Sequence, residues 1–450
     1  MATRSDAKTA SLACVGEAYH LEEQAGPLWP GWDLASTPIL LAGDDCSYLV
    51  GTNGAREGFR SFDGWALPLY RGPAQAGDDP LAALVTTNAL DSEHPQGPAE
   101  FVGLILREAF AFHRAGRVPP YPGAAGRYPE ASATNNVLGR IEGMLLHDLL
   151  TGGAGDEALT AFALVRRERR ERLDDALVAV EQACEIRLGL GLYIELRAFL
   201  AATTAHYRPT AAFRALTGGH AGFQEVLGSR YEGLRAMNRG ASRFAHTGMA
   251  LALCLDRVYP GWAAELGPTV SLDDLVERKV AFDGGDNDEA VLLRAKERHG
   301  YFEEVLQERQ WLRDLAGRRE QLLAELFHTS GLKLVFDVSA LDPALVTGHR
   351  RVEPLKNHIL LYHGPCSFRF GPTTLEFGGV RLLEDRLTGL LQVATRPGRL
   401  RFEGDRRPFT LQIPAEFTGG LALDIPEVKV RARQGVLYDA DGVLYVKLLR

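Results

Sequence analysis

Arg107 and Glu108 are the residues of this 450-residue chain that are hardest to explain by folding alone. The apolar residues of their segment, 99–113, recur at the spacing of one helix face: Phe101, Leu104, Ile105 and Phe112. Glu108 falls on that stripe, and burying a carboxylate is costly unless a cation pairs with it. Two explanations stay open: an ion pair of Glu108 with Arg107, Arg140 or Arg243 in the core, or a helix face that lines a pocket.

His246 is the best candidate among the histidines for acid–base chemistry, because imidazole titrates near neutral pH and the segment 244–249 contains a glycine. A hydrogen-bonded structural role is the alternative. The other histidines of the helical region are scattered, with no pair at the i,i+4 spacing of a metal site. The chain also lacks a G-x-S-x-G nucleophile elbow, a Walker loop and a strand-linked G-x-G-x-x-G motif.

Helical periodicity between about residues 99 and 327 predicts most of the elements that hold these residues. The expected helices are 98–114, 134–151, 156–172, 174–204, 210–217, 220–228, 230–258, 271–280, 287–299 and 301–328. Strand-like segments precede them at 38–42, 46–50, 65–70 and 81–87, and period-two segments follow at 332–338, 358–362, 390–394, 409–413, 428–431 and 443–448. We therefore expect an α+β protein with a small N-terminal α+β lobe (1–95), a mainly helical central domain (96–330) and a C-terminal β domain (331–450).

The segment 166–172 is rich in arginine and has two i,i+4 pairs, Arg167 with Glu171 and Glu168 with Arg172. Such pairs are typical of a helix face exposed to solvent, which is our prediction here. Gly189 and Gly191 lie inside a helical pattern, which favours close helix packing over a backbone that lets a ligand approach.

The composition excludes several classes of protein. A formal charge of -8 and a pI near 5.9 argue against nucleic acid and anionic membrane as partners. We find no secretion signal and no apolar run long enough to span a membrane. Five cysteines that are far apart, with no C-x-x-C pair, favour a reducing cytoplasm over a disulfide framework.

Five segments together resemble a bacterial family similar to gluzincin zinc metallopeptidases. They read LREAFAFH at 106–113, NNVLGRIEGMLL at 135–146, FALVRRERR at 162–170, LGLGLYIELR at 188–197 and FAHTGMALALCLDR at 244–257, followed by YPGW at 259–262. In that family the first helix reads L-H-E-x-F-H and the later helix reads E-G-L-A-E-Y-V-E. The resemblance covers roughly residues 27 to 280, and a weaker similarity extends to the C-terminal β domain.

The resemblance implies a gluzincin-like central domain whose zinc ligands have been replaced. The two histidine positions of the H-E-x-x-H helix fall on Arg107 and Ala111, and the glutamate ligand of the second helix falls on Leu188. None of these three side chains binds zinc, so only Glu108, at the position of the general base, is retained. We expect no metal, no cofactor and loss of the hydrolytic mechanism that depends on zinc.

The expected function is therefore binding of a peptide, a protein segment or a small acidic ligand in the cleft that remains between the helices around 98–114 and 181–199. The ligand-binding residues would be Arg107, Glu108, Ala111, Leu188, Tyr193, Arg243 and His246. Two alternatives stay open: a metal-independent hydrolase or lyase that uses Glu108 with His246 or Tyr193, and a structural subunit of a larger assembly.

Overall fold

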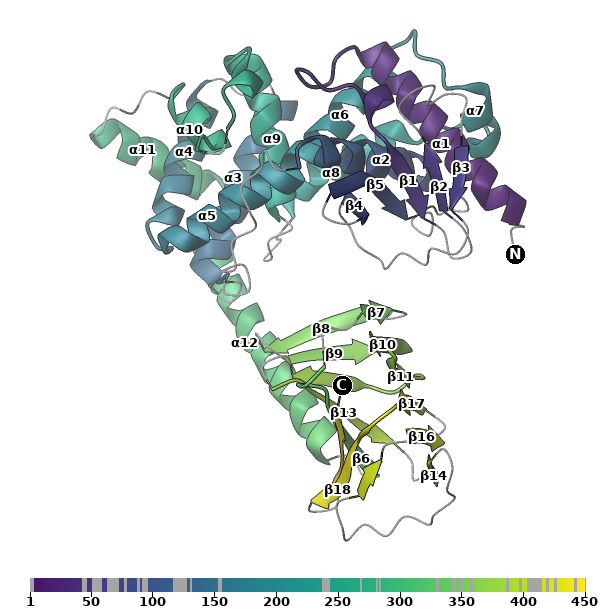
Figure 1. Ribbon diagram of the computed structural model, residues 1–450. Helices are drawn as coiled ribbons and strands as arrows, with labels where there is room; N and C mark the ends of the chain where they lie inside the picture. The colour runs from purple at the N-terminus through teal and green to yellow at the C-terminus, as the bar shows by residue number, and fades with distance from the viewer. Residues whose placement is uncertain are drawn as a thin grey trace. The chain divides into compact units, whose positions relative to one another are not determined.

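The structure is a computed structural model of the whole chain. It describes residues 4–42, 47–50, 59–62, 73–76, 79–86, 90, 96–115, 128–129, 132–152, 156–236, 243–267, 269–280, 282, 285–328, 332–341, 345–347, 351–356, 359–385, 388–395, 399–402, 415–417, 421–424, 427–440 and 443–449. The protein is of the α+β class, as expected, with two compact units, Met1–Gln310 and Trp311–Arg450. We call them the helical unit and the β unit (Figure 1).

The helical unit combines a bundle of helices with one small sheet. Its helices are α1 (Arg4–Ala25), α2 (Gly97–His113), α3 (Ala133–Thr151), α4 (Asp156–Arg170), α5 (Asp175–Cys184), α6 (Leu190–Ala202), α7 (Ala211–Thr217), α8 (Phe223–Arg235), α9 (Arg243–Val258), α10 (Leu272–Glu277), α11 (Asp286–Arg298) and the start of α12 (Tyr301–His328). The strands β1 (Ile39–Ala42), β2 (Ser47–Val50), β3 (Phe59–Phe62), β4 (Pro73–Ala76) and β5 (Asp79–Thr86) form a sheet of order β3-β2-β1-β5-β4. Helix α2 packs against β5 on one side and against α6 on the other.

Several helix predictions need correction. The predicted helix 230–258 is wrong, because α8 ends at Arg235 and α9 begins at Arg243. The predicted helix 174–204 is one helical run, but a π-helical turn at Glu185–Gly189 separates α5 from α6. Helix α1 was not predicted, since its buried face is made largely of small residues such as Ala10, Cys14 and Ala18, whose hydropathy gives a weak periodic signal.

The strand predictions hold at most positions. The segments 38–42 and 46–50 contain β1 and β2, and 81–87 overlaps β5, whereas the predicted strands at 65–70 and 409–413 lie outside the described residues. In the β unit the period-two segments match β6 (Leu332–Asp337), β9 (Ile359–His363), β13 (Leu390–Thr395), β17 (Val428–Ala432) and β19 (Val443–Leu448). Strands β18 (Gly435–Ala440) and β19 pair antiparallel and form a C-terminal hairpin.

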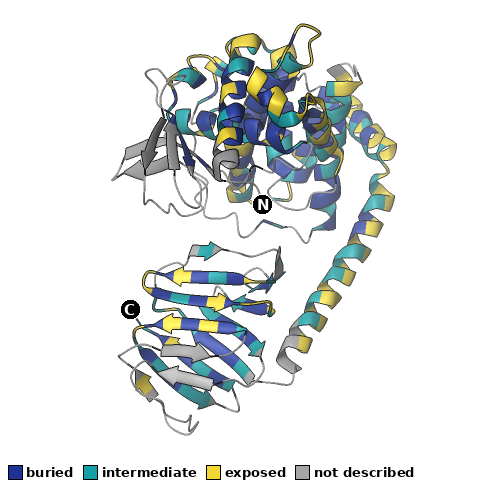
Figure 2. Ribbon diagram, turned by 90° about the vertical axis from the view of Figure 1, so that its right-hand side faces the viewer, coloured by how far each residue is buried: buried dark blue, intermediate teal, exposed yellow. Residues whose placement is uncertain are grey.

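The β unit is a sandwich of two sheets. One sheet has the order β14-β16-β17-β11-β10-β7 and the other β15-β18-β19-β6-β13-β12-β9-β8. The remaining strands are β7 (Leu345–Thr347), β8 (Arg351–Lys356), β10 (Cys366–Phe370), β11 (Thr373–Phe377), β12 (Leu382–Asp385), β14 (Arg399–Phe402), β15 (Ala415–Phe417) and β16 (Leu421–Asp424). A shared core that includes Phe336, Phe368, Phe377 and Val446 fills the space between the sheets, and buried residues alternate with exposed ones along the strands (Figure 2).

Candidate functional site

The α2–α6 cluster consists of Gly103, Arg107, Gly191, Glu195 and Arg230. Arg107 on α2 forms an ion pair with Glu195 on α6, and Arg230 on α8 donates to the same carboxylate from Nε at 2.9 Å. A Cβ atom at Gly103 would lie 2.7 Å from Cδ of Glu195, so only glycine leaves room for that carboxylate. The side chain of Arg107 lies against Gly191, where a Cβ would make an ordinary contact at 3.5 Å. On each of the two helices, a glycine therefore lies against the charged side chain of the other helix.

The charged residues of this cluster are two arginines and one glutamate. Glu195 is completely buried, while the side chains of Arg107 and Arg230 keep 24% and 19% of their accessible surface. Within this cluster two partly exposed guanidinium groups therefore share one buried carboxylate. A guanidinium in such a place can bind a carboxylate or phosphate through two parallel hydrogen bonds.

The residues at the other predicted zinc-ligand positions lie at the surface. Ala111, one turn after Arg107 on α2, is exposed, and Leu188 is 45% exposed. Leu188 belongs to the π-helical turn Glu185–Gly189 that precedes α6. Ala111 and Leu188 are thus both accessible to solvent, and their grouping with Arg107 in one site stays a prediction.

The predicted apolar stripe of α2 is displaced by about one position. The buried residues are Phe101, Val102, Ile105, Leu106, Ala109 and Phe110, whereas Leu104, Glu108 and Phe112 are only half-buried. The three arginines expected as partners of Glu108 all contact other carboxylates: Arg107 contacts Glu195, Arg140 contacts Glu304, and Arg243 contacts Glu181. A pairing of Glu108 with one of them stays a prediction.

Tyr193 lies apart from this region, in an aromatic core. Its ring packs edge-on against Trp29 and Trp262, and its hydroxyl lies 3.0 Å from both carboxylate oxygens of Asp256 on α9. Burial and the neighbouring Asp256 carboxylate raise the pKa of Tyr193 well above its usual range. The hydroxyl is therefore a hydrogen-bond donor to Asp256 at neutral pH.

Asp256 is ten residues beyond His246 on the same helix, a rise of about 15 Å. Tyr193 and His246 therefore lie at opposite ends of α9. This separation argues against their working together as an acid–base pair.

His246 and Arg243 line a small cavity between α3, α8 and α9, of about 10 Å³, which is room for about one water molecule. The cavity-lining side chains fit there because Gly139 and Gly233 have no Cβ atom. A Cβ at Gly139 would lie 2.5 Å from Nη1 of Arg243, and a Cβ at Gly233 would lie 2.4 Å from Nε2 of His246. Arg243 is buried and its Nη2 contacts the hydroxyl of Tyr128. The structure thus brings Arg243 and His246 together, but not with Tyr193.

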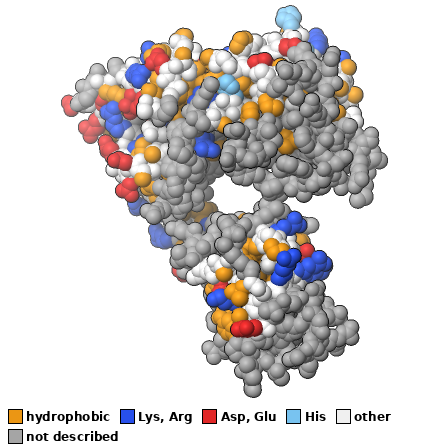
Figure 3. Space-filling view, in the orientation of Figure 1, with side chains coloured by type: hydrophobic (Ala, Val, Ile, Leu, Met, Phe, Trp, Pro, Cys, Tyr) orange, Lys and Arg blue, Asp and Glu red, His pale blue; other side chains and the backbone are white. Residues whose placement is uncertain are grey.

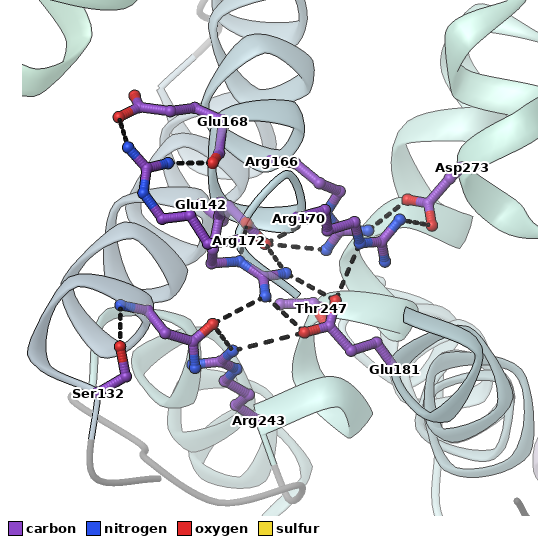
Figure 4. A network of polar contacts seen from close by, with 12 residues as sticks. Ser132, Glu142, Arg166, Glu168, Arg170, Arg172, Glu181, Arg243, Thr247 and Asp273 are labelled. Carbon is purple, nitrogen blue, oxygen red and sulfur yellow. Dashed lines mark hydrogen bonds and ion pairs between the residues drawn. The ribbon is translucent and has the colours of Figure 1, made fainter. Parts of the chain in front are cut away.

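The described residues of the helical unit include a buried ion-pair network that the sequence prediction missed (Figure 4). Its cations are Arg166, Arg169 and Arg170 of α4 and Arg243 of α9, and its anions are Glu142, Glu181, Glu185 and Asp273. Four guanidinium groups thus face four carboxylates. The prediction that 166–172 is a solvent-exposed face is wrong for this side of α4, because Arg166 and Arg169 are 4% and 0% exposed.

Arg169 is the centre of the network. Its guanidinium donates to Glu142 and Glu181, with Nη2 at 2.8 Å from Oε2 of Glu181, and Nη1 lies 3.2 Å from Oδ1 of Asn135. These arginine charges hold the pKa of Glu181 well below its usual range despite burial, which acts in the opposite direction. The network is electrically balanced only while all four carboxylates are ionised.

Glu185 is the exception among these carboxylates. Burial, together with the neighbouring charge of Asp273, raises the pKa of Glu185 to about 7, although Arg166 opposes this shift. Arg166 donates from Nη2 to Oε1 of Glu185 at 2.7 Å, and the hydroxyl of Thr247 donates to the same oxygen at 2.9 Å. Glu185 begins the π-helical turn, a local geometry that often occurs at functional sites.

The same turn explains one of the glycines that stood out in the sequence. A Cβ at Gly189 would lie 2.6 Å from Cα of Gly248, and a Cβ at Gly248 would lie 2.3 Å from the carbonyl oxygen of Glu185. Backbone therefore meets backbone where this turn crosses α9. Close packing, the favoured interpretation of Gly189, is confirmed.

The spacing of Arg166, Arg169 and Arg170 in the sequence could have indicated that these arginines lie on the buried side of α4. Arg166 follows Phe162, Arg169 follows Val165 and Arg170 follows Arg166, each at an i,i+4 interval, so the arginines continue the buried stripe of α4. Their partners, however, lie on α3, α5, η4 (Glu185–Gly189) and α10 and could not be identified from the local pattern.

Among the described residues, no group of three or more His, Cys, Asp or Glu side chains is arranged to hold a metal ion, and no helix is long and apolar enough to cross a membrane. Comparisons of the chain with protein-family models, with curated protein sequences and with solved structures give no match.

Proposed function

We propose that the helical unit binds the carboxylate of an acidic ligand, in a peptide or protein segment, at the α2–α6 cluster, without hydrolysing it. The observation that carries this proposal is the pairing of two partly exposed guanidinium groups, Arg107 and Arg230, with the single buried carboxylate of Glu195. A ligand carboxylate would supply the second negative charge. Its bonds to guanidinium would be charge-assisted, the stronger class of hydrogen bond.

The surroundings of Arg107 favour a ligand that is partly apolar. Ala111, one turn after Arg107 on α2, is exposed and offers apolar surface to a side chain next to the carboxylate. We infer that the exposed Leu188 borders the same site. Such a site recognises a ground-state ligand by charge and shape. Catalysis would require additional groups that act on a transition state.

Binding should be measured by fluorescence anisotropy with labelled hexapeptides that end either in a free carboxylate or in a carboxamide. We expect the parent protein to prefer the free carboxylate and Arg107→Ala to lose this preference, because a carboxamide has no negative charge and only one oxygen that can accept from the guanidinium. Arg235→Ala, which removes an exposed arginine from the end of α8, is the matched control and should retain the preference. Equal binding of both peptides by the parent would contradict the proposal.

Turnover is followed on the same peptides by mass spectrometry, with and without added zinc, and bound zinc is measured by elemental analysis. We expect intact peptides and less than stoichiometric zinc, because Arg107, Ala111 and Leu188 offer no ligand atoms. Cleavage that Glu108→Gln abolishes would favour the metal-independent enzyme. Absence of any carboxylate binding would favour the structural subunit.

A further inference from the structure

The six-stranded sheet of the β unit carries arginines in one row across its strands. The strand register aligns Leu345, Arg369, Thr374, Arg431, Ala422 and Arg401, on β7, β10, β11, β17, β16 and β14 in turn. Residues directly opposite one another in an antiparallel pair lie on the same face of the sheet. Arginine therefore recurs at every second strand, at intervals of about 10 Å, with an uncharged residue between each pair.

This face of the sheet is exposed to solvent. On β10, β11 and β17 the neighbouring residues Phe368, Leu375 and Val430 point into the core between the sheets, whereas Arg369 and Arg431 are exposed. Lys429, two residues before Arg431 on β17, is exposed as well. Figure 3 shows basic side chains gathered on the side of the β unit where β10, β11 and β17 lie.

Acidic residues compensate this charge only in part. Glu376 lies opposite Lys429 in the register, yet neither Arg369 nor Arg431 is ion-paired with a carboxylate in the described part of the chain. The β unit has more lysines and arginines than aspartates and glutamates, although the whole chain has a formal charge of -8. We call the surface formed by Arg369, Lys429 and Arg431 the basic face.

We propose that the basic face binds a short acidic segment of a protein partner. The guanidinium groups stand far enough apart to engage several carboxylates at once, and arginine is suited to paired hydrogen bonds with such groups. Binding of this kind depends on charge complementarity and needs no groove.

Other polyanions fit this surface less well. Single-stranded nucleic acid is held by aromatic side chains on which bases stack, and the described outward positions of β10, β11 and β17 hold Ser367, Arg369, Thr374, Glu376, Lys429 and Arg431, none of which is aromatic. Duplex recognition uses a helix or ribbon that enters a groove, which a flat sheet face does not provide. Stable membrane attachment needs apolar insertion, and the exposed large hydrophobic residues of the described chain all lie in the helical unit.

The test uses the full chain and a fluorescein-labelled decapeptide of alternating glutamate and serine, with a glutamine–serine decapeptide as the neutral control. We expect Arg369→Gln and Arg431→Gln each to weaken binding of the acidic peptide about threefold, and the double variant about tenfold, as for exposed charge pairs. Arg381→Gln changes the net charge equally, but Arg381 directly precedes β12 of the other sheet, and this variant should bind as the parent does. Raising the salt from about 50 to 300 mM should weaken parental binding through screening.

An acidic peptide could also occupy the α2–α6 cluster, so the measurement is repeated with Arg107→Ala in both the parent and the double variant. The basic face is supported if the double variant weakens binding equally on both backgrounds. Binding that depends on Arg107 but not on Arg369 and Arg431 would refute this inference and leave the proposed function intact. Tighter binding to oligo(dT) or to vesicles rich in phosphatidylserine than to the acidic peptide would exclude an acidic protein segment as the partner.

Discussion

Replacing Arg169 by methionine tests whether the buried network stabilises the helical unit. Methionine keeps much of the aliphatic volume of arginine but removes the charge that Glu142 and Glu181 share. Both carboxylates are buried, so at neutral pH the variant must either hold an uncompensated charge or take up a proton. Removing one partner of a buried ion pair costs about 3–5 kcal/mol, which is a large part of the total stability of an ordinary domain.

The assay is chemical denaturation of the full chain, followed by circular dichroism at pH 8 and at pH 5. In the parent, the lowered pKa of Glu181 stabilises the fold at every pH above the unfolded value near 4.3. In Arg169→Met the same carboxylate is buried without this cation, so its pKa should rise and its protonation should relieve the destabilisation as the pH falls. The loss of stability should therefore be larger at pH 8 than at pH 5.

The matched control is Arg172→Met. Arg172 is 46% exposed and forms an i,i+4 pair with Glu168, a kind of pair that contributes about 0.3–0.5 kcal/mol. Similar losses of stability in the two variants would refute the view that the network is buried and essential to the fold.

Three further results are expected. The pKa of Glu185 is raised to about 7, so the folded protein binds a proton more tightly than the unfolded chain, and the free energy of unfolding should fall by about 1.4 kcal/mol per pH unit between pH 4.5 and 7. Denaturation curves of Glu185→Gln should show a weaker dependence of this free energy on pH. Gly189→Ala should destabilise the protein by about 3 kcal/mol because the added Cβ meets the backbone of Gly248, whereas Gly228→Ala, whose Cβ would have no atom within 4 Å, should stabilise it slightly. Equal melting temperatures of the two variants would contradict this. Tyr193→Phe should cost about 1–2 kcal/mol through the lost bond to Asp256 but leave peptide binding unchanged, and weakened binding would place Tyr193 in the site.

The sequence predicted the α+β class and most elements because periodicity is a local property. The inward and outward alternation of β17, for example, is visible in five consecutive residues. The end of α8 was predicted less well, because the segment 230–258 was assigned to a single helix. Asn238, Gly240 and Ser242, residue types common at helix ends, lie between α8 and α9 in the sequence, and the prediction of a single helix gave them too little weight.

The candidate sites were predicted less well because their geometry depends on contacts between distant residues. Arg107 was identified, but Arg230 was not, since it comes to Glu195 from a helix that begins more than twenty residues later in the chain. The interpretation of Arg166 and Arg169 failed for the same reason. An i,i+4 rule describes neighbours on one helix and cannot show that Glu142 and Asp273 cover its other side.

The reciprocal packing of α2 and α6 restricts how this protein can change by single substitutions. Gly103 and Arg107 on one helix match Glu195 and Gly191 on the other, so a side chain added at position 103 displaces the carboxylate that Arg107 requires. A neutral residue at position 107 would leave Glu195 with Arg230 alone. Related chains should therefore vary at positions 103, 107 and 195 together, and a route from this arrangement to any other passes through a less stable intermediate.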